Sequence, residues 1–403
     1  MPADSASSPG LLLHIAPTPF FSDRGCHIRI AGIVRSLQAL GFDNHVATYH
    51  TGYDLDDIQT SRINTIKAYQ KTSAGPSVYK ILADFRLLTL SIRQVRALNP
   101  VALHAHLHEG VLIALLCRLW LRRKDLPITA DMQGSLVGEL DTYGFFNKVP
   151  FLKWPFRQLE RWLLRSADGI VCSSEHALAK FEREFPESAS KMLLAQDGAD
   201  APTVDNDIPL NQRRTQLGIP DNTLCAIYTG ALLDSKGQEP LQELIRNCAN
   251  AAAPVHFLIV GYPVEQMQAF IKAHSLEHSC TMTGRVEFSE LAHYLALADV
   301  AIDPKRSDAG EGSGKMLNYL ASGLPVIAFN THNNLSFLGA DTTPCNSVDD
   351  MRDQLMVYAS NPQQLDKDAD RNRQRFELAY SWTVTEKQLS QSYQALGLLK
   401  TNA

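Results

Sequence analysis

The sequence predicts an α/β protein with two doubly wound parallel sheets, because one pattern occurs twice along the chain. Short apolar runs rich in β-branched residues alternate with longer stretches of helical periodicity, which is typical of buried parallel strands joined by crossover helices. A polar, proline-containing segment, residues 201–222, interrupts the alternation, which then restarts. The length of 403 residues suits two domains. Two such domains joined by one linker would make a deep cleft.

The expected strands and helices follow from this alternation. In the first half we expect strands at Leu11–Pro17, His45–His50, Thr65–Gln70, Val101–Leu107, Pro127–Gln133, Gly169–Ser174 and Lys191–Gln196. The helices between them are expected at Ile28–Leu40, Val78–Leu98, Glu109–Arg122 and Glu175–Glu184. In the second half we expect strands at Leu224–Gly230, Val255–Gly261, Cys280–Val286, Val300–Pro304 and Pro325–Asn330, with helices between them and more after Ser347.

The last helix is expected to begin at Thr383, because Thr383-Val-Thr-Glu386 has the spacing of a capping box. Leu389, Tyr393 and Leu396 share one face, which must pack against a domain. The predicted organisation is a first domain at 1–200, a linker at 201–222, a second domain at 223–380 and a C-terminal helix at 381–403, with its return to the first domain as one option.

Composition and charge exclude several classes of protein. The 45% hydrophobic and 20% charged residues are globular proportions, and the net charge of −5 argues against a nucleic-acid partner. The longest apolar run, Gly110–Leu121, is broken by Arg118 and is too short to cross a bilayer. Residues 1–10 lack the basic residues of a secretory signal. Seven scattered cysteines without a C-x-x-C pair predict reduced thiols in a cytoplasmic protein.

The first candidate site is the loop after the first expected strand. A proline-rich turn leads to Gly25 and then to a helix. A glycine at this point lets backbone N–H groups approach an anion or a sugar at the helix N-terminus. An ordinary strand-to-helix turn is the simpler interpretation of a single glycine.

Three histidines mark the fourth expected strand. Strand alternation puts His104, His106 and His108 on one face, and we expect at least one of them at the cleft, where open α/β sheets bind ligands. Three imidazoles at this spacing are also zinc ligands in principle. The sequence has no H-E-x-x-H and no carboxylate or cysteine at a recognisable ligand spacing, so we expect no metal.

The second half carries two candidate anion sites. Gly230 ends an expected strand, and Lys236-Gly237 precedes the next helix, where a lysine either holds a diphosphate or is simply solvated. Further along, Gly312-Ser313-Gly314 opens a helix whose N-terminal N–H groups and dipole favour phosphate. Glu311 precedes this turn and can accept hydrogen bonds from sugar hydroxyls, and Asn318 lies about one turn along the helix.

Eight short motifs follow one another in order along nearly the whole chain. They are Pro-x-Pro-Phe-Phe…Arg-Gly at 17–25, Leu-His-Ala-His at 103–106, Val-Cys-Ser-Ser at 171–174, Gln-Asp-Gly-Ala-Asp at 196–200, Tyr-Thr-Gly…Lys-Gly at 228–237, Gly-Arg-Val at 284–286, Ala-Asp-Val-Ala-Ile-Asp-Pro at 298–304 and Lys-Met-Leu-Asn-Tyr-Leu-Ala-Ser-Gly-Leu-Pro-Val at 315–326. With these motifs the chain resembles the family 4 glycosyltransferases of the group 1 type, which have the GT-B fold. Each motif alone is weak, and their shared order and spacing make the match specific.

The resemblance implies transfer of a hexose-type sugar from a UDP- or GDP-sugar, with retention at the anomeric carbon and without a metal or other cofactor. The first domain would receive a glycan or lipid-linked acceptor, as in cell-envelope polysaccharide synthesis, and the second would bind the donor. The implied catalytic residues are His106, which would contact the sugar, Lys236, which would hold the diphosphate, and Glu311. Donor-binding positions would be Gly25, Gly230, Lys236, Arg285 by the base, Lys305, Gly312, Ser313, Gly314, Lys315 and Asn318.

Two positions depart from the family pattern. Ala231 stands where the family has an arginine, and the candidates to supply that charge are Lys305, Arg306 and Lys315. The family also has two glutamates with seven residues between them, and this sequence does not keep that pattern. Alignment on the Ala-Ser-Gly that begins at 321 places Gly310 at the first and Asn318 at the second, with Glu311 one position late. Two rival functions therefore stay open: a GT-B sugar-nucleotide epimerase and a non-catalytic nucleotide-sugar-binding partner.

The segment 151–165 is the candidate membrane contact. Trp154 and Trp162 flank a basic stripe, as aromatic anchors do at a lipid interface. The stripe recurs every four residues, at Lys153, Arg157, Arg161 and Arg165. A solvated helix face with inward-packed tryptophans is the alternative. The membrane interpretation makes the protein peripheral on the inner face of the membrane, in contact with anionic lipid.

Overall fold

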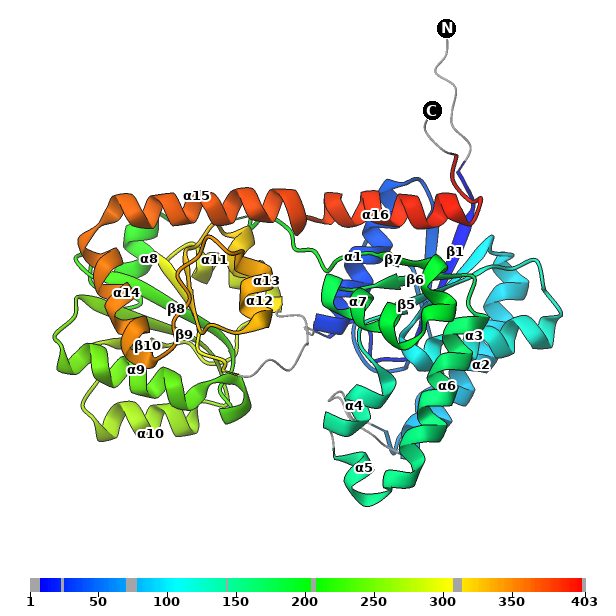
Figure 1. Ribbon diagram of the computed structural model, residues 1–403, viewed down its shortest axis with the longest axis horizontal. Helices are drawn as coiled ribbons and strands as arrows, with labels where there is room; N and C mark the ends of the chain where they lie inside the picture. The colour runs from blue at the N-terminus through cyan, green and yellow to red at the C-terminus, as the bar shows by residue number, and fades with distance from the viewer. Residues whose placement is uncertain are drawn as a thin grey trace, which may run out of the picture. The chain divides into compact units, whose positions relative to one another are not determined.

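The chain forms two compact α/β units in the computed structural model, which describes residues 8–22, 25–69, 78–142, 144–203, 208–306 and 314–400 (Figure 1). The first unit runs to Gly198 and includes the chain from Trp382 onwards, and the second unit is Ala199–Ser381. Each unit has its own parallel sheet and its own hydrophobic core. The two units are therefore separate folding modules of the kind that the repeated sequence pattern predicts.

The first unit contains a seven-stranded sheet in the order β3-β2-β1-β4-β5-β6-β7, and every paired neighbour runs parallel. Its strands are β1 (Leu11–Ala16), β2 (Asp43–Thr48), β3 (Thr60–Arg62), β4 (Ala102–His106), β5 (Ile128–Met132), β6 (Gly169–Cys172) and β7 (Met192–Leu194). The strand order reverses between β1 and β4. Such a switch point is where open α/β sheets bind ligands, at the carboxyl ends of the strands.

Helices cover both faces of this sheet, as Figure 1 shows. They are α1 (Gly25–Ala39), α2 (Val78–Leu98), α3 (Leu107–Leu121), α4 (Leu136–Thr142), α5 (Phe145–Lys148), α6 (Lys153–Ser166), α7 (Glu175–Glu184) and α16 (Trp382–Ala395), with short 3-10 turns at Pro150–Leu152 and Pro186–Lys191. Alternation along β1 divides the core. Leu13 and Ile15 pack with residues of α2 and α3, whereas Leu12 packs on the opposite face with residues of α1 and α16.

The expectation of a strand at Thr65–Gln70 is wrong for the described residues 65–69. The edge strand is β3, at Thr60–Arg62, and it pairs with β2. The apolar Ile63, Ile66 and Tyr69 pack into the core from the segment after the strand. The apolar residues of this segment therefore indicate burial and not a strand. The edge strand β3 consists of polar residues and is defined by its backbone pairing with β2.

The last helix packs on the first unit. It begins at Trp382, one residue before the expected start, and the Trp382 ring lies against Gly32 of α1 and Gly198. A side chain at either glycine would collide with the indole, so both positions require glycine for close packing. Leu389 and Tyr393 are buried against α1 and β1 residues, as their shared face predicts.

The second unit contains a five-stranded parallel sheet in the order β10-β9-β8-β11-β12. The strands are β8 (Leu224–Ala231), β9 (Val255–Tyr262), β10 (Cys280–Met282), β11 (Val300–Asp303) and β12 (Val326–Ala328). β10 is shorter than the expected strand Cys280–Val286, and Gly284 follows it with a φ of 74°. The helices are α8 (Leu210–Gln216), α9 (Gln238–Asn250), α10 (Glu265–Ala273), α11 (Leu291–Leu295), α12 (Gly314–Ala321), α13 (His332–Leu338), α14 (Val348–Ser360) and α15 (Pro362–Ala379), with 3-10 turns at Asp234–Lys236 and Phe288–Glu290.

The segment expected as a linker, residues 201–222, contributes structure to the second unit. It contains α8, and the Arg214 guanidinium donates to the Leu297 carbonyl oxygen and pairs with Asp299 at 2.8 Å. Ile219 is buried in the core of this unit. The prolines precede or follow the short helix instead of marking a connection that makes no contacts.

All seven cysteines are in described parts of the chain and carry free thiols. No helix among the described residues is both long and apolar enough to span a bilayer.

Candidate functional sites

The second unit has its switch point between β8 and β11, and most of the predicted donor-binding residues lie at this edge of the sheet. β8 pairs with β9 on one side, with Gly230 opposite Gly261, and with β11 on the other. The chain leaves β8 toward Lys236 and leaves β11 toward Lys305. The carboxyl ends of parallel strands meet at one edge, so these two loops are neighbours.

Gly237 brings the two loops into contact. It has a φ of 91°, and a Cβ atom there would lie 2.5 Å from the Pro304 carbonyl oxygen and 2.9 Å from the Lys305 nitrogen. Only glycine fits this backbone conformation and this close approach. The two lysines, Lys236 and Lys305, are 69 positions apart in sequence. They nevertheless lie on backbone segments that touch. Two lysines at the end of a parallel sheet form a basic edge suited to a phosphate group.

Lys315 has a different environment from the one expected. Its Nζ lies 2.6 Å from the Oδ1 of the buried Asp303 and 4.9 Å from the centre of the Tyr228 ring. The neighbouring Tyr319 hydroxyl accepts a hydrogen bond from the Thr229 backbone N–H at 2.8 Å. These contacts fasten α12 to the ends of β8 and β11. Asp303 neutralises the charge of Lys315, so this lysine is a poor substitute for the arginine missing at Ala231.

Arg306 is also engaged within the unit. Its guanidinium lies 4.9 Å from the centre of the Phe329 ring and 3.9 Å from a carboxylate oxygen of Glu243. Of the three candidates to supply the missing charge, Lys305 is the one whose backbone lies against Gly237, in the loop that carries Lys236.

The N-terminus of α12 is only partly described. Glu311, Gly312 and Ser313 lie outside the described residues, so their predicted roles stay predictions. Gly314 is exposed as the first helical residue, and no described residue lies within 4 Å of the position of a Cβ atom there. Asn318 lies one turn further along and is half-buried, with its carbonyl oxygen accepting from the Ser322 hydroxyl at 2.8 Å.

Two residues at this edge were missed by sequence reasoning. Tyr262 ends β9 with half of its surface exposed, and the Arg285 guanidinium lies 5.5 Å from its ring centre. A flat, exposed aromatic paired with a guanidinium is a surface on which a base can stack. Gln238 is buried as the first residue of α9, and neither polar atom of its amide has a partner among the described residues. A bulky aromatic directly after a buried strand was the available signal for Tyr262.

The first unit has its switch point between β1 and β4, and histidines gather there. His14 of β1 is the register partner of His104 of β4, and His106 follows two positions later on the same face. The expectation for His108 is wrong: Leu107 has a φ of 62°, α3 begins, and His108 lies 3.1 Å from Glu160 instead. His14, which the sequence did not single out, takes the third place.

His106 is held by a buried charged network. Its Nδ1 lies 2.8 Å from Asp131 Oδ2, and its Nε2 lies 3.1 Å from His14 Nδ1. Arg29 pairs with Asp131 and with Asp197, each at 2.6 Å. Burial by itself would raise the pKa of Asp131, but the Arg29 charge and the His106 hydrogen bond outweigh it and hold the pKa well below its usual value. The His106 side chain has no exposed surface in this structure, so its contact with a sugar stays a prediction.

Gly25 is the first residue of α1 and is exposed. No described residue lies within 4 Å of the position of a Cβ atom at Gly25, and the φ of Gly25 is not positive. The local structure therefore accepts a larger residue here, and the fold alone does not explain the glycine.

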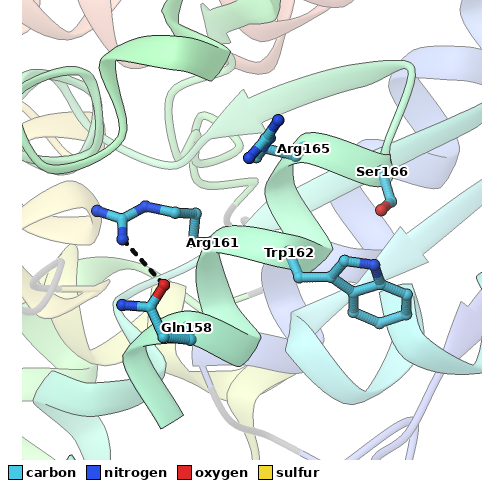
Figure 2. Close-up of a pocket in the computed structure, with 5 residues that line it drawn as sticks. All are labelled: Gln158, Arg161, Trp162, Arg165 and Ser166. Atoms are coloured by element: carbon cyan, nitrogen blue, oxygen red, sulfur yellow. Dashed lines mark hydrogen bonds between the residues drawn. The ribbon is translucent and has the colours of Figure 1, made fainter. Parts of the chain in front are cut away.

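The basic stripe on α6 differs from the expected free face. Lys153 pairs with Asp141 at 2.9 Å, Arg157 with Glu184 at 3.4 Å and Arg161 with Glu187 at 3.0 Å. Arg165 is exposed and lines a shallow pocket with Gln158, Arg161, Trp162 and Ser166 (Figure 2). Acidic neighbours thus cancel most of the stripe's charge. Both tryptophans are exposed, Trp154 at 69% and Trp162 at 48%, so the alternative of inward-packed rings is wrong.

Comparison with known proteins agrees with this arrangement of two units. Residues 24–194 match the glycosyl transferase 4-like domain, and residues 211–375 match the glycosyl transferases group 1 family. A GDP-mannose-dependent monoacylated alpha-(1-6)-phosphatidylinositol monomannoside mannosyltransferase from Corynebacterium glutamicum is 27% identical over 179 residues. That match covers 43% of this chain and 47% of the relative, so it spans about half of the relative's length.

Two solved structures show the same fold over almost the whole chain. Sucrose-phosphate synthase from Thermosynechococcus elongatus superposes with a TM-score of 0.74 at 16% identity, over 96% of this chain and 99% of that one. HepE from Anabaena, solved in complex with UDP, has a TM-score of 0.69 at 14% identity, over 96% and 99%. The architecture is that of the GT-B fold. With both halves matched in order, this chain belongs to the group 1 glycosyltransferases with a family 4-like N-terminal domain.

Proposed function

We propose that this chain is a retaining glycosyltransferase that moves a hexose-type sugar from a UDP- or GDP-sugar to a glycan or lipid-linked acceptor. The observation that carries the proposal is the basic edge of the second unit, where Gly237 brings the Lys236 loop against Lys305 at the switch point. Family membership supports glycosyl transfer. Two similar proteins support a UDP- or GDP-sugar as the donor. One was solved with UDP, and the other is named as GDP-mannose-dependent.

The chemistry needs positioning and charge stabilisation more than a protein nucleophile. The bond from the anomeric carbon to the diphosphate breaks, and the acceptor oxygen bonds to that carbon on the same face. The acceptor proton passes to the departing diphosphate. Lys236 and Lys305 would stabilise the negative charge that develops on the leaving group, which is the largest contribution a site of this kind makes. The exposed Tyr262 and Arg285 would hold the base. No metal enters the proposed step.

A surface of the first unit supports a lipid-linked acceptor. α2 packs beside α3, and α3 beside α6 (Figure 1). These three helices and the turn before α6 expose large apolar side chains: Ile81, Phe85, Leu119, Trp120, Phe151, Trp154 and Trp162. Exposed aromatics of this kind insert into the headgroup region of a bilayer. We propose that this surface makes the protein peripheral at a membrane, through apolar contacts more than through the largely neutralised stripe on α6.

The test is a panel of UDP- and GDP-hexoses with oligosaccharide and glycolipid acceptors, run in the presence of a chelator. We expect one donor to release its nucleoside diphosphate and to form a product whose anomeric configuration, read by NMR, matches that of the donor. A new sugar epimer would assign the chain to the epimerases. Binding without turnover would make it a nucleotide-sugar-binding partner, and an inverted product would overturn retention.

A further inference from the structure

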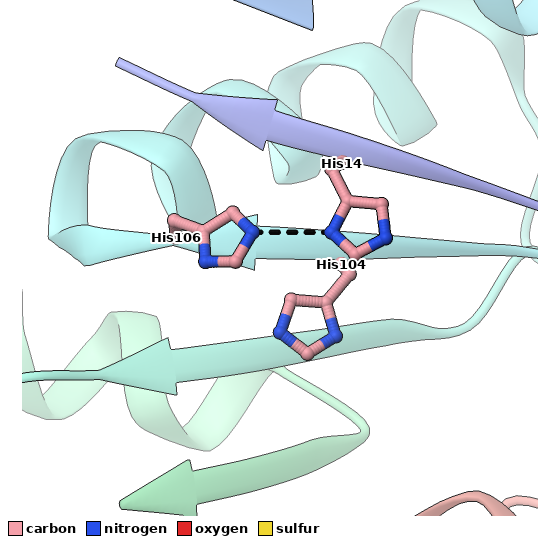
Figure 3. Close-up of side chains that lie close together, drawn as sticks. All are labelled: His14, His104 and His106. Atoms are coloured by element: carbon pink, nitrogen blue, oxygen red, sulfur yellow. Dashed lines mark hydrogen bonds between the residues drawn. The ribbon is translucent and has the colours of Figure 1, made fainter. Parts of the chain in front are cut away.

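Three buried imidazoles lie close together at the β1–β4 switch point (Figure 3). Each is also held by a hydrogen bond from outside the cluster. His14, His104 and His106 have no exposed surface, and one ring nitrogen from each lies within 4.8 Å of the others. Each remaining nitrogen has a hydrogen-bond partner at 2.8 Å. The partner of His14 is Asn44, that of His104 is Tyr393 and that of His106 is Asp131.

These outer partners decide where the protons of two histidines lie. The Asn44 Nδ2 group donates to the Phe42 carbonyl oxygen, so Asn44 Oδ1 faces His14 and accepts a hydrogen bond from the Nε2–H group of His14. The Asp131 carboxylate likewise accepts from His106 Nδ1. In the neutral imidazoles the other nitrogen of each ring is then an acceptor without a hydrogen. His14 Nδ1 and His106 Nε2 therefore present lone pairs to each other across 3.1 Å.

Two facing lone pairs in a buried site repel each other unless a proton or a metal cation lies between or beside them. The third histidine also needs a partner for one of its nitrogens, because His104 Nε2 is buried with no partner among the described residues. A buried polar atom of this kind calls for an explanation such as a missing ion. His104 belongs to the same cluster as His14 and His106.

We propose that His14, His104 and His106 form a binding site for a divalent transition-metal ion such as zinc. Two ligand nitrogens on one tetrahedral zinc lie about 3.3 Å apart, as follows from Zn–N bonds of about 2.0–2.1 Å, and the two facing nitrogens are 3.1 Å apart. Imidazole suits Zn²⁺, Cu²⁺ and Ni²⁺. The carboxylate of Asp131 is the kind of partner that orients metal-bound histidines in proteins, and hydrogen bonds to Asn44 and Tyr393 fix the other two rings.

The ion would join β1 to β4 at the switch point. Its binding forms coordination bonds from imidazoles that are already without a proton on the bonding nitrogen, so no redox or group-transfer step is involved. This inference does not depend on the proposed function, because the proposed sugar transfer uses no metal. A metal ion bound to His106 Nε2 would, however, exclude direct contact between that nitrogen and a sugar, because the nitrogen has a single lone pair.

The metal content of the whole chain tests the site. Protein made with a tag that contains no histidine is measured for zinc by mass spectrometry, and we expect close to one ion per chain. Tyr393→Phe keeps the ring and removes the hydrogen bond to His104, so it should weaken zinc binding by about tenfold or more. His104→Gln should abolish binding. His176→Gln, an exposed histidine on α7, is the matched control and should keep its zinc.

A second measurement stands even if His104→Gln does not fold. Wild-type chain stripped with a chelator and titrated with Co²⁺ should show the visible absorption bands of nitrogen-coordinated cobalt. A stripped chain that takes up neither Co²⁺ nor Zn²⁺ would overturn the proposal and would leave a proton on His106, paired with Asp131, between the rings. Equal zinc in the wild type, Tyr393→Phe and a folded His104→Gln would also overturn it, because that metal would be bound elsewhere.

Discussion

The Nζ atom of Lys315 lies 2.6 Å from the Oδ1 atom of Asp303 and joins the first turn of α12 to the end of β11. Asp303 is almost fully buried and Lys315 is 17% exposed at its side chain. The pair therefore fixes the helix whose N-terminus is expected to face the donor.

Breaking this pair should destabilise the second unit. Asp303→Asn leaves the Lys315 ammonium without its counter-charge, and we expect a loss of about 2–4 kcal/mol in the free energy of unfolding, near the lower end for buried pairs because Lys315 keeps some solvent. Asp370→Asn in the exposed Arg373–Asp370 pair is the control, with an expected change below about 1 kcal/mol. Urea unfolding should be followed by circular dichroism, because all four tryptophans are in the first unit. Equal effects of the two variants would contradict the structural role.

Lys236→Ala should slow turnover by at least about tenfold, because a charge-assisted hydrogen bond contributes roughly 1.5–3 kcal/mol. Initial rates with the active donor measure the effect. Lys272→Ala changes an exposed lysine on α10 and should leave the rate unchanged. Wild-type kinetics for Lys236→Ala would remove this lysine from the donor site.

Gly25→Ala separates a structural from a ligand-related need for glycine. A Cβ atom at this position meets no described residue within 4 Å, and alanine is the better helix former. We therefore expect unchanged or slightly higher thermal stability together with turnover reduced several-fold. Full activity in the variant would show that no ligand approaches Gly25. Gly237→Ala is the contrasting case, because its Cβ would collide with Pro304 and the fold itself should weaken.

Asp84 should make the first unit less stable as the pH rises. Burial raises the pKa of this carboxyl from 3.8 to about 6, against the lowering effects of the Tyr49 hydroxyl and Lys80. The folded state then binds more protons than the unfolded state between these two values, so stability falls as the pH increases from about 4 to 6 and stays lower above. Asp84→Asn should raise the free energy of unfolding by about 1–3 kcal/mol at pH 7.5 and by much less at pH 4. A gain of the same size at both pH values would contradict the shifted pKa.

The proposal that exposed apolar side chains of α2, α3 and α6 contact the membrane predicts that apolar contacts dominate vesicle binding. Trp120→Gln with Trp154→Gln should greatly reduce sedimentation with phosphatidylglycerol vesicles, because both rings are about 70% exposed. Arg157→Glu with Arg161→Glu should have a smaller effect, since acidic neighbours already pair with both arginines. Strong salt dependence and a larger loss in the arginine variant would restore the electrostatic interpretation of α6.

Local sequence pattern was sufficient for the regular elements. The helices Val78–Leu98 and Glu175–Glu184 match their expected bounds, because an apolar stripe of helical period and a Ser174 cap are encoded within a few residues. Buried parallel strands were recognisable for the same reason, since both faces are apolar. The polar edge strand β3 was not, because its only determinant is the backbone of β2 beside it.

The motif order by itself identified the family and the Lys236–Gly237 loop as a candidate site. Which groups meet at each switch point was decided only by the tertiary structure. Alternation put His104 and His106 on one face, but the parallel register of β1 against β4, across about 90 intervening residues, brought His14 to them and the turn at Leu107 removed His108. The pairing of Lys315 with Asp303 has the same origin. Strand register and helix packing join residues that are distant along the chain, and no spacing within one segment contains that information.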